Sequence, residues 1–450
     1  MSRSAQPAAG GAPAGAPGAA PEVVVETRLE KALGHGFRKV TAVAFAPYQT
    51  AVIRIGFALT WLCFLLREWP HREELYGPRG PFDAELAHQL LATNHSFSVL
   101  MWSDGEVWFN LVYGLAVIAA ALLLVGWRTR TMSVLFMVGV LSLLNRSILL
   151  GDGGDNVLHI MSLYLVMTRC GQVWSLDARR ARRAAAAPPG RDGVGVALWS
   201  LSGLVLLVAQ VGGAYGLYWF HDGPLPLVGW SLAFWGMWAA HGLWWVARRR
   251  SGELRPLLEV LTRLIHNGAL LVIMVEVCLI YATAGWYKIQ GGRWQDGTAV
   301  YYPMNLHYFS PWPELSHLLA GHGTIMMLIT YGTVVVQVAF PFTVFNRRLK
   351  NVLLVGMICE HLSIAVLLGL PFFSLAMITA DAVFLPTSFL RAVGRRVAAL
   401  GKRYGSGGAG LDGGRTGRGP DRTGATDAAG PVPGGAKGLP APAEDTAAAG

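Results

Sequence analysis

Long apolar segments recur along the chain between Tyr48 and Leu390, separated by short polar stretches. A helix needs about 20 consecutive apolar residues to cross the hydrocarbon core of a bilayer, and these segments have about that length. The pattern therefore predicts an all-α fold, a polytopic integral membrane helical bundle with nine or ten transmembrane helices. The segments 227–247 and 371–388 fit it least well. The predicted spans are 48–68, 106–126, 131–150, 156–172, 194–219, 227–247, 267–288, 323–344, 350–369 and 371–388.

The two ends of the chain depart from this pattern. Residues 1–21 and 404–450 are rich in Gly, Ala and Pro and hold too little apolar bulk to pack, so we expect disordered tails. No apolar core follows Arg3, so the first tail does not have the pattern of a signal peptide. Residues 22–46 form a basic juxtamembrane segment, either a short amphipathic helix or a plain basic flank. The transmembrane domain is predicted to occupy 47–395.

Basic residues between the apolar segments predict the orientation of the chain. Counted over alternate sides of the predicted spans, 24 Lys and Arg residues flank one side and 6 flank the other. Cytoplasmic loops carry an excess of Lys and Arg, so both termini are predicted to be cytoplasmic. The chain is predicted to lie in the cell membrane and to cross it several times. Arg146, Lys288 and the segments 69–105 and 289–322 then face the outer side.

Composition and motifs exclude several classes of function. The chain is 14% charged, and its net charge of +10 comes from clusters between apolar segments, so no nucleic-acid partner is expected. It contains no HExxH, P-loop, GxSxG or dinucleotide fingerprint, which argues against conventional hydrolases, kinases and dehydrogenases. Gly151–Asn156 lacks the spacing of a calcium loop and predicts a tight turn. Neither a disulfide nor a metal site is expected, because the cysteines lie far apart in apolar segments: Cys63, Cys170, Cys278 and Cys359.

Several ionisable residues fall inside the predicted spans or at their ends. A charge at bilayer depth costs several kcal/mol, so each such residue needs a partner or a function. Glu360 and His361 are adjacent, which on a helix points them about 100° apart, so each must find its partner on another helix. The full set is Arg54, His159, Glu276, Glu360, His361 and Asp381, with Arg146 and Lys288 at the outer boundary.

Lys288 is the most informative of these residues. It ends the apolar run Leu270–Tyr287, and the small residues Ala282, Ala284 and Gly285 before it allow a neighbouring helix to approach closely. Burial against that helix would favour the neutral amine, which is a competent base. The dipole of the helix C-terminus acts in the opposite sense. The ordinary alternative is a terminal lysine whose amine reaches the lipid headgroups.

The outer segment 289–322 is unusually aromatic. Such side chains are typical of an interfacial aromatic belt, and the alternative is a cover over a cavity. The aromatic residues are Trp294, Tyr301, Tyr302, Tyr308, Phe309 and Trp312.

Three strings taken in order resemble the HTTM (horizontally transferred transmembrane) family, whose membrane domain is shared with vitamin K-dependent γ-glutamyl carboxylase. The likeness covers roughly 45–395. The strings are Leu144-Asn145-Arg146-Ser147 with Gly151-Asp152, leading to Ser175-Leu176-Asp177; Ala284-Gly285-x-x-Lys288-Ile289 with Arg293-Trp294-x-Asp296-Gly297; and Glu360-His361 with Pro371-Phe372-Phe373.

The resemblance implies a helical membrane domain with a chamber open to the non-cytoplasmic face. Lys288 would be the catalytic base that starts quinol oxygenation. Substrate-binding residues would be Asn145, Arg146, Trp294, Glu360 and His361. Two departures stand out. The carboxylase has His where this chain has Arg146, which can bind a carboxylate or phosphate but cannot act as an acid or base. The carboxylase also carries a large lumenal domain after its membrane region, so carboxylation of a docked peptide is not expected here.

Three functions remain open on these grounds. The first is a carboxylase-like or quinol-dependent membrane enzyme, with a quinone or quinol as the implied cofactor. The second is a non-catalytic accessory protein that assists the maturation or export of a secreted peptide, as implied by bacterial relatives of the domain. The third, a transporter, predicts two inverted halves, and no internal repeat is present. For all three functions the predicted location is a bacterial inner membrane. The predicted partners are the lipid bilayer and either a quinone or an exported peptide.

Overall fold

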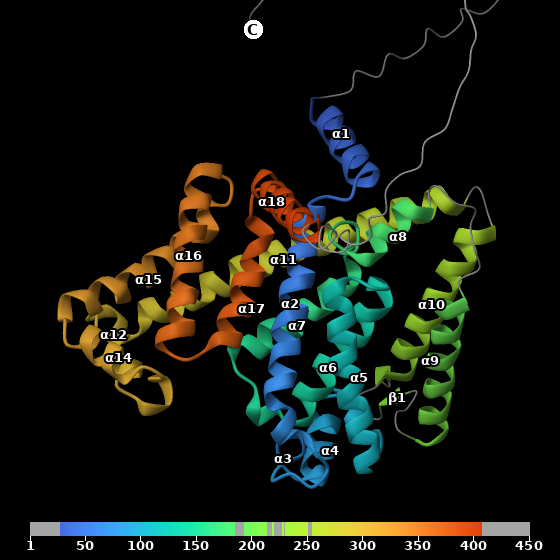
Figure 1. The fold of residues 1–450 in the computed structure, drawn as a ribbon, viewed down its shortest axis with the longest axis horizontal. Coiled ribbons are helices and arrows are strands. Elements are labelled where there is room, and N and C mark those ends of the chain that lie inside the picture. The colour runs from blue at the N-terminus through green and yellow to red at the C-terminus, as the bar shows by residue number, and fades with distance from the viewer. Residues whose placement is uncertain are drawn as a thin grey trace, which may run out of the picture. The chain divides into compact units, whose positions relative to one another are not determined.

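The computed structural model describes residues 28–184, 193–213, 218–219, 227–228, 230–250 and 254–406. The regular elements among these residues are helices, apart from one antiparallel pair of two-residue strands, β1 (Tyr218–Trp219) and β2 (Leu227–Val228) (Figure 1). The predicted all-α fold is confirmed. The chain divides into two units, 1–393 and 394–450, and the second is described only through the last part of one helix.

Six of the described helices are long and apolar enough to cross a membrane. They are α2 (Pro47–Glu68), α5 (Glu106–Val125), α9 (Gly193–Val211), α11 (Leu254–Gln290), α15 (Gly323–Thr343) and α16 (Arg347–Leu367). A bent pair raises the number to as many as seven. It consists of α17 (Pro371–Asp381) with the 3-10 turn η5 (Ala382–Phe384), followed after a bend of 115° by α18 (Thr387–Ser406). The chain thus has the helices that a multi-pass membrane protein needs.

The remaining predicted spans coincide with helices that are shorter or more polar. They are α6 (Thr129–Arg146), α7 (Gly153–Met167) and α10 (Trp230–Arg250). Most residues of α6 are buried against other helices and few face outward. The helix therefore does not need to be apolar along its whole length. The span predicted for 131–150 ends early, at Arg146, and 267–288 is part of a longer helix. The structure supports six or seven of the ten predicted spans by length and composition.

Shorter helices connect the long ones. The described part of the predicted juxtamembrane segment is helix α1 (Arg28–Ala42), and Tyr404–Ser406 form the last turn of α18. The predicted tails 1–21 and 407–450 lie outside the described residues. The other short elements are η1 (Trp69–His71), α3 (Arg72–Tyr76), α4 (Ala84–Thr93), η2 (Val99–Trp102), η3 (Ile148–Leu150), α8 (Leu176–Ala184), α12 (Gly292–Gln295), α13 (Tyr301–Met304), η4 (His307–Phe309) and α14 (Pro313–Ala320).

The core is formed where α2, α5, α6, α7 and α17 pack together, and α11, α15 and α16 join it through α17 and α7 (Figure 1). Glycines allow three of these contacts to be very close. A Cβ atom at Gly56 would lie 2.2 Å from Thr379, and one at Gly154 would lie 2.7 Å from the backbone of Phe373. Small residues at crossings are how helices associate in lipid, where apolar burial gives little driving force.

Gly285 makes the third close contact, on α11. A Cβ atom there would lie 2.6 Å from Val338 Cγ2 on α15. The close helix approach predicted from the small residues before Lys288 is therefore confirmed, and it brings the end of α11 against α15.

Helices α9 and α10 pack through two tryptophans that exchange hydrogen bonds. Trp199 Nε1 donates to the carbonyl of Trp238 at 3.0 Å, and Trp238 Nε1 donates to the carbonyl of Trp199 at 2.9 Å. The indole of Trp238 lies over Gly203 and that of Trp199 lies over Gly242, where no Cβ atom would fit. The segment 227–247, the less certain of the two helices by sequence, is thus the packing partner of α9.

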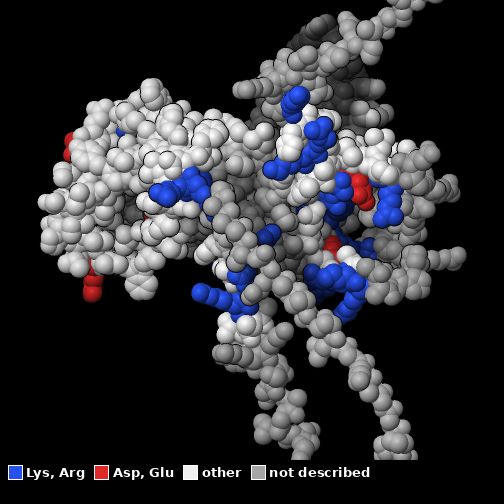
Figure 2. All heavy atoms as spheres, turned by 90° about the horizontal axis from the view of Figure 1, so that it is seen from above, with Lys and Arg blue, Asp and Glu red and all other residues white. Residues whose placement is uncertain are grey.

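Many of the described Lys and Arg residues lie at one end of the helical bundle. Arg54 near the start of α2 bonds to the end of α5, and Lys350 at the start of α16 donates to the carbonyl of Phe384 in η5, so these termini lie together. Asp177 at the start of α8 accepts hydrogen bonds from the backbone of Arg128 and Thr129 and so caps α6. Figure 2 shows Lys and Arg side chains gathered on this face, with few acidic ones.

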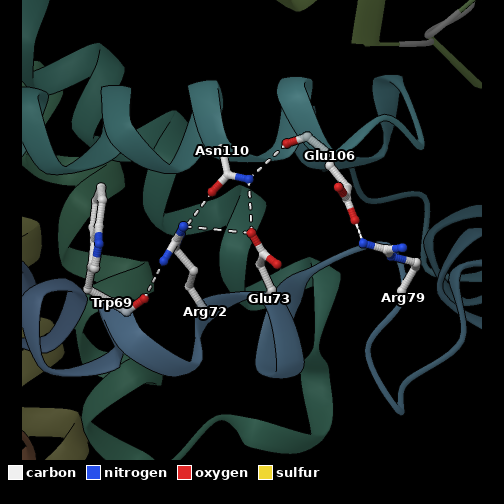
Figure 3. Close-up of polar contacts among 6 residues, drawn as sticks. All are labelled: Trp69, Arg72, Glu73, Arg79, Glu106 and Asn110. Atoms are coloured by element: carbon white, nitrogen blue, oxygen red, sulfur yellow. Dashed lines mark hydrogen bonds and ion pairs between the residues drawn. The ribbon is translucent and has the colours of Figure 1, made fainter.

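The segment 69–105 is held to the start of α5 by polar contacts (Figure 3). Arg72 Nε donates to Asn110 Oδ1 at 2.9 Å, and Asn110 Nδ2 donates to Glu73 at 3.1 Å and to the carbonyl of Glu106 at 3.0 Å. Arg79 forms an ion pair with the Glu106 carboxylate. These contacts are largely exposed and fix the connection between α2 and α5.

Candidate functional site

Lys288 is held by other helices near the end of α11. Its Nζ donates to Oε1 of Gln337 on α15 at 2.7 Å and lies 5.2 Å from the ring centroid of Trp294 in α12. Lys288 is half-buried, and Gln337 is buried. The amine is therefore bound to protein, which differs from the ordinary picture of a terminal lysine that reaches outward. The close contact at Gly285, less than one turn earlier, sets the helix spacing that this bond requires.

Gln337 links Lys288 to Glu360. Its Nε2 donates to Oε1 of Glu360 on α16 at 2.5 Å. An amide oxygen accepts and an amide nitrogen donates, so this orientation suits an amine or ammonium on one side and a carboxylate on the other. No ion pair within the described residues joins Lys288 directly to Glu360. We call Lys288, Gln337 and Glu360 the lysine group.

The lysine group can hold a proton in two places without a change in its total charge. With an ammonium and a carboxylate the charges cancel, and with an amine and a carboxylic acid both partners are neutral. In a medium of low dielectric constant the two states lie closer in free energy than they would in water, because separated charges lose solvation. The second carboxylate oxygen, Oε2 of Glu360, is buried and has no hydrogen-bond partner among the described residues. The arrangement is suited to proton transfer.

His361 bonds in a different direction from Glu360. Its Nε2 lies 3.0 Å from the hydroxyl of Tyr281 on α11, and that hydroxyl lies 3.0 Å from both carboxylate oxygens of Asp381. All three side chains are at most 2% exposed. The prediction that Glu360 and His361 find partners on separate helices is therefore confirmed. Gln337 on α15 is the hydrogen-bond partner of Glu360, and Tyr281 on α11 is that of His361.

Gln337 and Tyr281 were not identified from the sequence, and Asp381 was identified only as one ionisable residue of several. Tyr281 precedes Lys288 by seven residues, which is close to two helical turns, so both side chains lie on the same face of α11. That spacing is a signal from which Tyr281 could have been found. Gln337 is a lone amide in the apolar run of α15, a weaker signal of the same kind.

Asn145 and Arg146 lie elsewhere. Asn145 Nδ2 donates to the carbonyl of Phe97 at 2.8 Å, and Arg146 Nη2 donates to the carbonyls of Gly77 and Phe82 at 2.8 and 3.0 Å. All of these partners belong to the segment 69–105. No contact within the described residues joins either side chain to Lys288, Glu360 or His361.

Arg146 borders a small cavity. The cavity has a volume of about 10 Å³, roughly the space of one water molecule, and Tyr76 and Asp104 also line it. The Nη1 of Arg146 is buried without a hydrogen-bond partner among the described residues. With 2% of the side chain exposed, Arg146 anchors a connecting segment and offers no open surface to a large ligand.

Arg54 is also explained by packing. Its guanidinium is fully buried in α2 and donates only to backbone carbonyls, those of Leu123, Leu124, Cys170 and Trp174. The first two are carbonyls in the last turn of α5, where the helix itself supplies few donors, and that of Leu123 also accepts from the backbone N–H of Gly126. Arg54 therefore joins α2 to α5 and to the connection before α8.

The segment Gly151–Asn156, predicted as a tight turn, contains the N-terminal cap of α7 and its first residues. Asp152 accepts hydrogen bonds from the backbone of Gly154 and Asp155, and Asp155 accepts one from the backbone of Asp152 at 3.0 Å, which forms a capping box at the start of α7. Burial raises the pKa of Asp155 to about 6. Nowhere in the described part of the chain do three His, Cys, Asp or Glu residues cluster so as to hold a metal ion.

Comparison with known proteins gives no relative from which a function can be transferred. No protein-family model matches the chain, and the searches of curated proteins and of solved structures find no match. The interpretation of the lysine group therefore rests on its own geometry.

Proposed function

We propose that the protein is a multi-pass protein of a bacterial inner membrane with ten membrane segments and both termini in the cytoplasm. Each of the ten apolar segments predicted from the sequence overlaps a helix or the bent α17–α18 pair, which supports the proposal. Lys and Arg side chains gather on one face of the described structure, which supports this orientation (Figure 2). The proposal includes membership of the HTTM family, carried by the three strings that contain Arg146, Lys288 and Glu360.

Within this membrane domain, the lysine group is the proposed site of a quinol-dependent reaction. The observation that carries the proposal is the bond from Lys288 Nζ to Gln337, which in turn bonds to Glu360 inside the helical bundle. Ionisable side chains that are placed against one another at bilayer depth are costly, and they are kept where they bind or transfer protons or ions. A quinol dissolves in the membrane and reaches such a site from the lipid.

In this mechanism Lys288 takes a proton from a hydroxyl of the bound substrate, because its amine is the group with a free lone pair in the neutral state of the lysine group. Gln337 fixes the position of the amine. Glu360 already carries its proton in this state, so the lysine group gains one positive charge in the step and loses it again when Lys288 releases the proton. Trp294 covers Lys288 on the α12 side and limits access of water. The quinol supplies the redox chemistry when it is bound.

The alternative of an accessory protein that assists an exported peptide receives less support. That interpretation uses Arg146 as an exposed anion-binding residue on the outer face. Its guanidinium is instead buried and donates to two backbone carbonyls of the protein itself. The enzyme interpretation depends on Lys288 and leaves Arg146 as an anchor.

The proposal is tested by native mass spectrometry and lipid analysis of the purified full-length protein. Lys288→Ala is compared with the wild type and with Lys350→Ala, a matched control at the other end of the bundle, where the amine donates to a backbone carbonyl. We expect a quinone to co-purify with the wild type and with Lys350→Ala. In Lys288→Ala its amount should fall about tenfold or more, equivalent to about 1.4 kcal/mol of lost binding. Retention of only bulk phospholipid by all three proteins would contradict the proposal.

A further inference from the structure

A second polar cluster lies inside the same bundle and takes no part in the mechanism above. It consists of Tyr281 on α11, His361 on α16 and Asp381 at the end of α17, and we call it the tyrosine cluster. The Tyr281 hydroxyl is its centre, with the imidazole on one side and the carboxylate on the other. Phe340 and Phe373 pack against its rings, so the surroundings are apolar.

The tyrosine cluster has fewer hydrogen-bond and ion-pair partners than a purely structural group of buried polar side chains needs. A carboxylate as deeply buried as Asp381 normally has a cation or several donors, yet no Lys or Arg in the described residues forms an ion pair with it. A single hydroxyl proton is shared between its two oxygens. His361 Nδ1 is also buried without a hydrogen-bond partner among the described residues. Apolar side chains of similar size would pack here without these unmet bonds.

Tyr281 can connect the other two groups by proton exchange. If Asp381 carries a proton, it donates to the phenol oxygen while the phenol donates to His361 Nε2. Passing the proton breaks the O–H bond of Asp381 and re-forms that of Tyr281, and it creates an N–H bond at His361. The result is a carboxylate and an imidazolium with an intact tyrosine, so atoms and charge balance and no oxidant is involved.

The position of the cluster relates it to both the lysine group and the basic end. Along α11, Tyr281 lies about 10 Å from Lys288 in the direction of the basic end. His361 is the neighbour of Glu360 in sequence. Asp381 is followed directly by η5, where the carbonyl of Phe384 accepts a hydrogen bond from Lys350. The cluster therefore lies on the side of the lysine group that faces the basic end.

We propose that Tyr281, His361 and Asp381 form a buried proton-loading site, in which the Tyr281 hydroxyl passes one proton between Asp381 and His361. The site stores the proton that the lysine group gives up or takes back, and this part of the inference rests on the proposed function. The ionisable groups near enough to interact electrostatically with the cluster are Glu360, Lys288 and Cys278.

The test is infrared difference spectroscopy of the full-length protein in lipid nanodiscs during a pH titration. Asp381→Asn and His361→Gln assign the carboxyl and imidazole signals, and Glu360→Gln removes the neighbouring carboxyl from the spectrum. Tyr281→Phe deletes only the connecting hydroxyl. Tyr113→Phe is the matched control, because Tyr113 is equally buried and its hydroxyl donates to the carbonyl of Leu65.

In the wild type and in Tyr113→Phe, we expect the Asp381 and His361 signals to change together in shared steps, as interacting groups do. In Tyr281→Phe they should separate, and the midpoint of the Asp381 signal should move by about one pH unit or more. Unchanged midpoints in Tyr281→Phe, or an equal shift in Tyr113→Phe, would overturn the inference. If Tyr281→Phe fails to fold, His361→Gln takes its place. In that variant the Asp381 signal should lose its shared steps and its midpoint should move.

Lys288→Ala keeps this test separate from that of the proposed function. Shared titration of Asp381 and His361 that survives in Lys288→Ala supports the proton-loading site, whether or not a quinone is bound. Loss of quinone from Lys288→Ala, together with independent titration of Asp381 and His361 in the wild type, would overturn the site and leave the proposed function standing.

Discussion

Among individual side chains, the polar residues inside the bundle differ in what they bond to. Arg54 and Arg146 donate only to backbone carbonyls, which fixes connections between elements. Lys288, Glu360 and His361 bond to other side chains, namely Gln337 and Tyr281. A side chain can change its protonation and its partners, whereas a backbone carbonyl is only an acceptor. This difference separates the structural cations from the candidate chemistry.

Replacing Arg54 should destabilise the fold strongly. Arg54→Met removes the donor to the carbonyl of Leu124 in α5 and to those of Cys170 and Trp174 in the connection to α8, and each buried group left unmet costs about 1–3 kcal/mol. We expect a loss of about 3 kcal/mol or more in the free energy of unfolding, measured by denaturation in nanodiscs. The control is Arg293→Met, whose guanidinium is 66% exposed and forms a surface ion pair with Asp296. Equal effects of the two variants would contradict the role given to Arg54.

Asp155 should make stability depend on pH. Its pKa is raised by burial from an ordinary value of 3.8 to about 6, so the folded state holds this proton more tightly than the unfolded state does. The stabilisation is fully present below pH 3.8 and is lost as the pH rises through about 6. We expect the melting temperature of Asp155→Asn to lack this component and, above pH 6, to be at least that of the wild type. A steeper decline in Asp155→Asn would contradict the assignment.

Between helices, the approach of α11 to α15 decides whether the lysine group can form. Gly285 is in van der Waals contact with Val338, and the bond from Lys288 to Gln337 lies less than one turn further along α11. A larger side chain at 285 would push the two helices apart and lengthen that bond. The contact between Gly285 and Val338 therefore both holds α11 against α15 and positions the lysine group.

Gly285→Ala should destabilise the protein and weaken the site, while Gly268→Ala should do neither. A methyl group at 285 meets Val338, and overpacking of this kind costs about 1–3 kcal/mol. A methyl group at 268, on the same helix, meets nothing within 4 Å. Thermal denaturation measures the first effect and retention of co-purified quinone the second. Loss of stability in Gly268→Ala of the same size would contradict the role given to the α11–α15 contact, because Ala favours the helix more than Gly does.

The sequence predicted the features that depend on residues close together in the chain, and it did not predict which helices come into contact. The helices follow from apolar runs, and the close contact at Gly285 follows from small residues, because both are local patterns. The partners of Glu360 and His361 were predicted only as lying on other helices, since sequence spacing places residues on a face and does not say which helix that face meets. Gln337 is neutral and lies in an apolar run, so a search for charges passes over it. Arg146 resembles a ligand-binding residue in sequence, and only the folded chain reveals the carbonyls it bonds to.

For the chain as a whole, the distribution of charge argues for one orientation in the membrane. Arg128 and Arg180 both pack on Trp127 after α5, Arg391 packs on Tyr48 at the start of α2, and Lys350 bonds to η5, which contacts α2. Lys and Arg side chains gather on one face (Figure 2). The connections near Arg72 and Glu106 lie at the opposite ends of α2 and α5 (Figure 3). An excess of basic residues on one side is what orients a membrane protein. The lysine group then lies toward the outer half of the bilayer.

Reporter fusions should show this orientation. Fusions that end at Arg183 and Arg348 are expected to give a cytoplasmic signal, and fusions that end at Asp104 and Pro224 a signal from the outer side. The expectation follows from the alternation of basic and non-basic connections along the chain. A cytoplasmic signal at Pro224 would mean that α9 and α10 do not both cross the membrane, and the span count would fall by two.

The most direct measurement is an electron cryomicroscopy structure of the full-length protein in nanodiscs, prepared with a quinone. We expect Lys288 Nζ to lie within hydrogen-bond distance of Gln337, Gln337 to contact Glu360, and density for the quinone head to lie against Lys288 and Trp294. A Lys288 side chain that extends to the lipid headgroups, with Gln337 and Glu360 apart and no quinone beside them, would contradict this expectation.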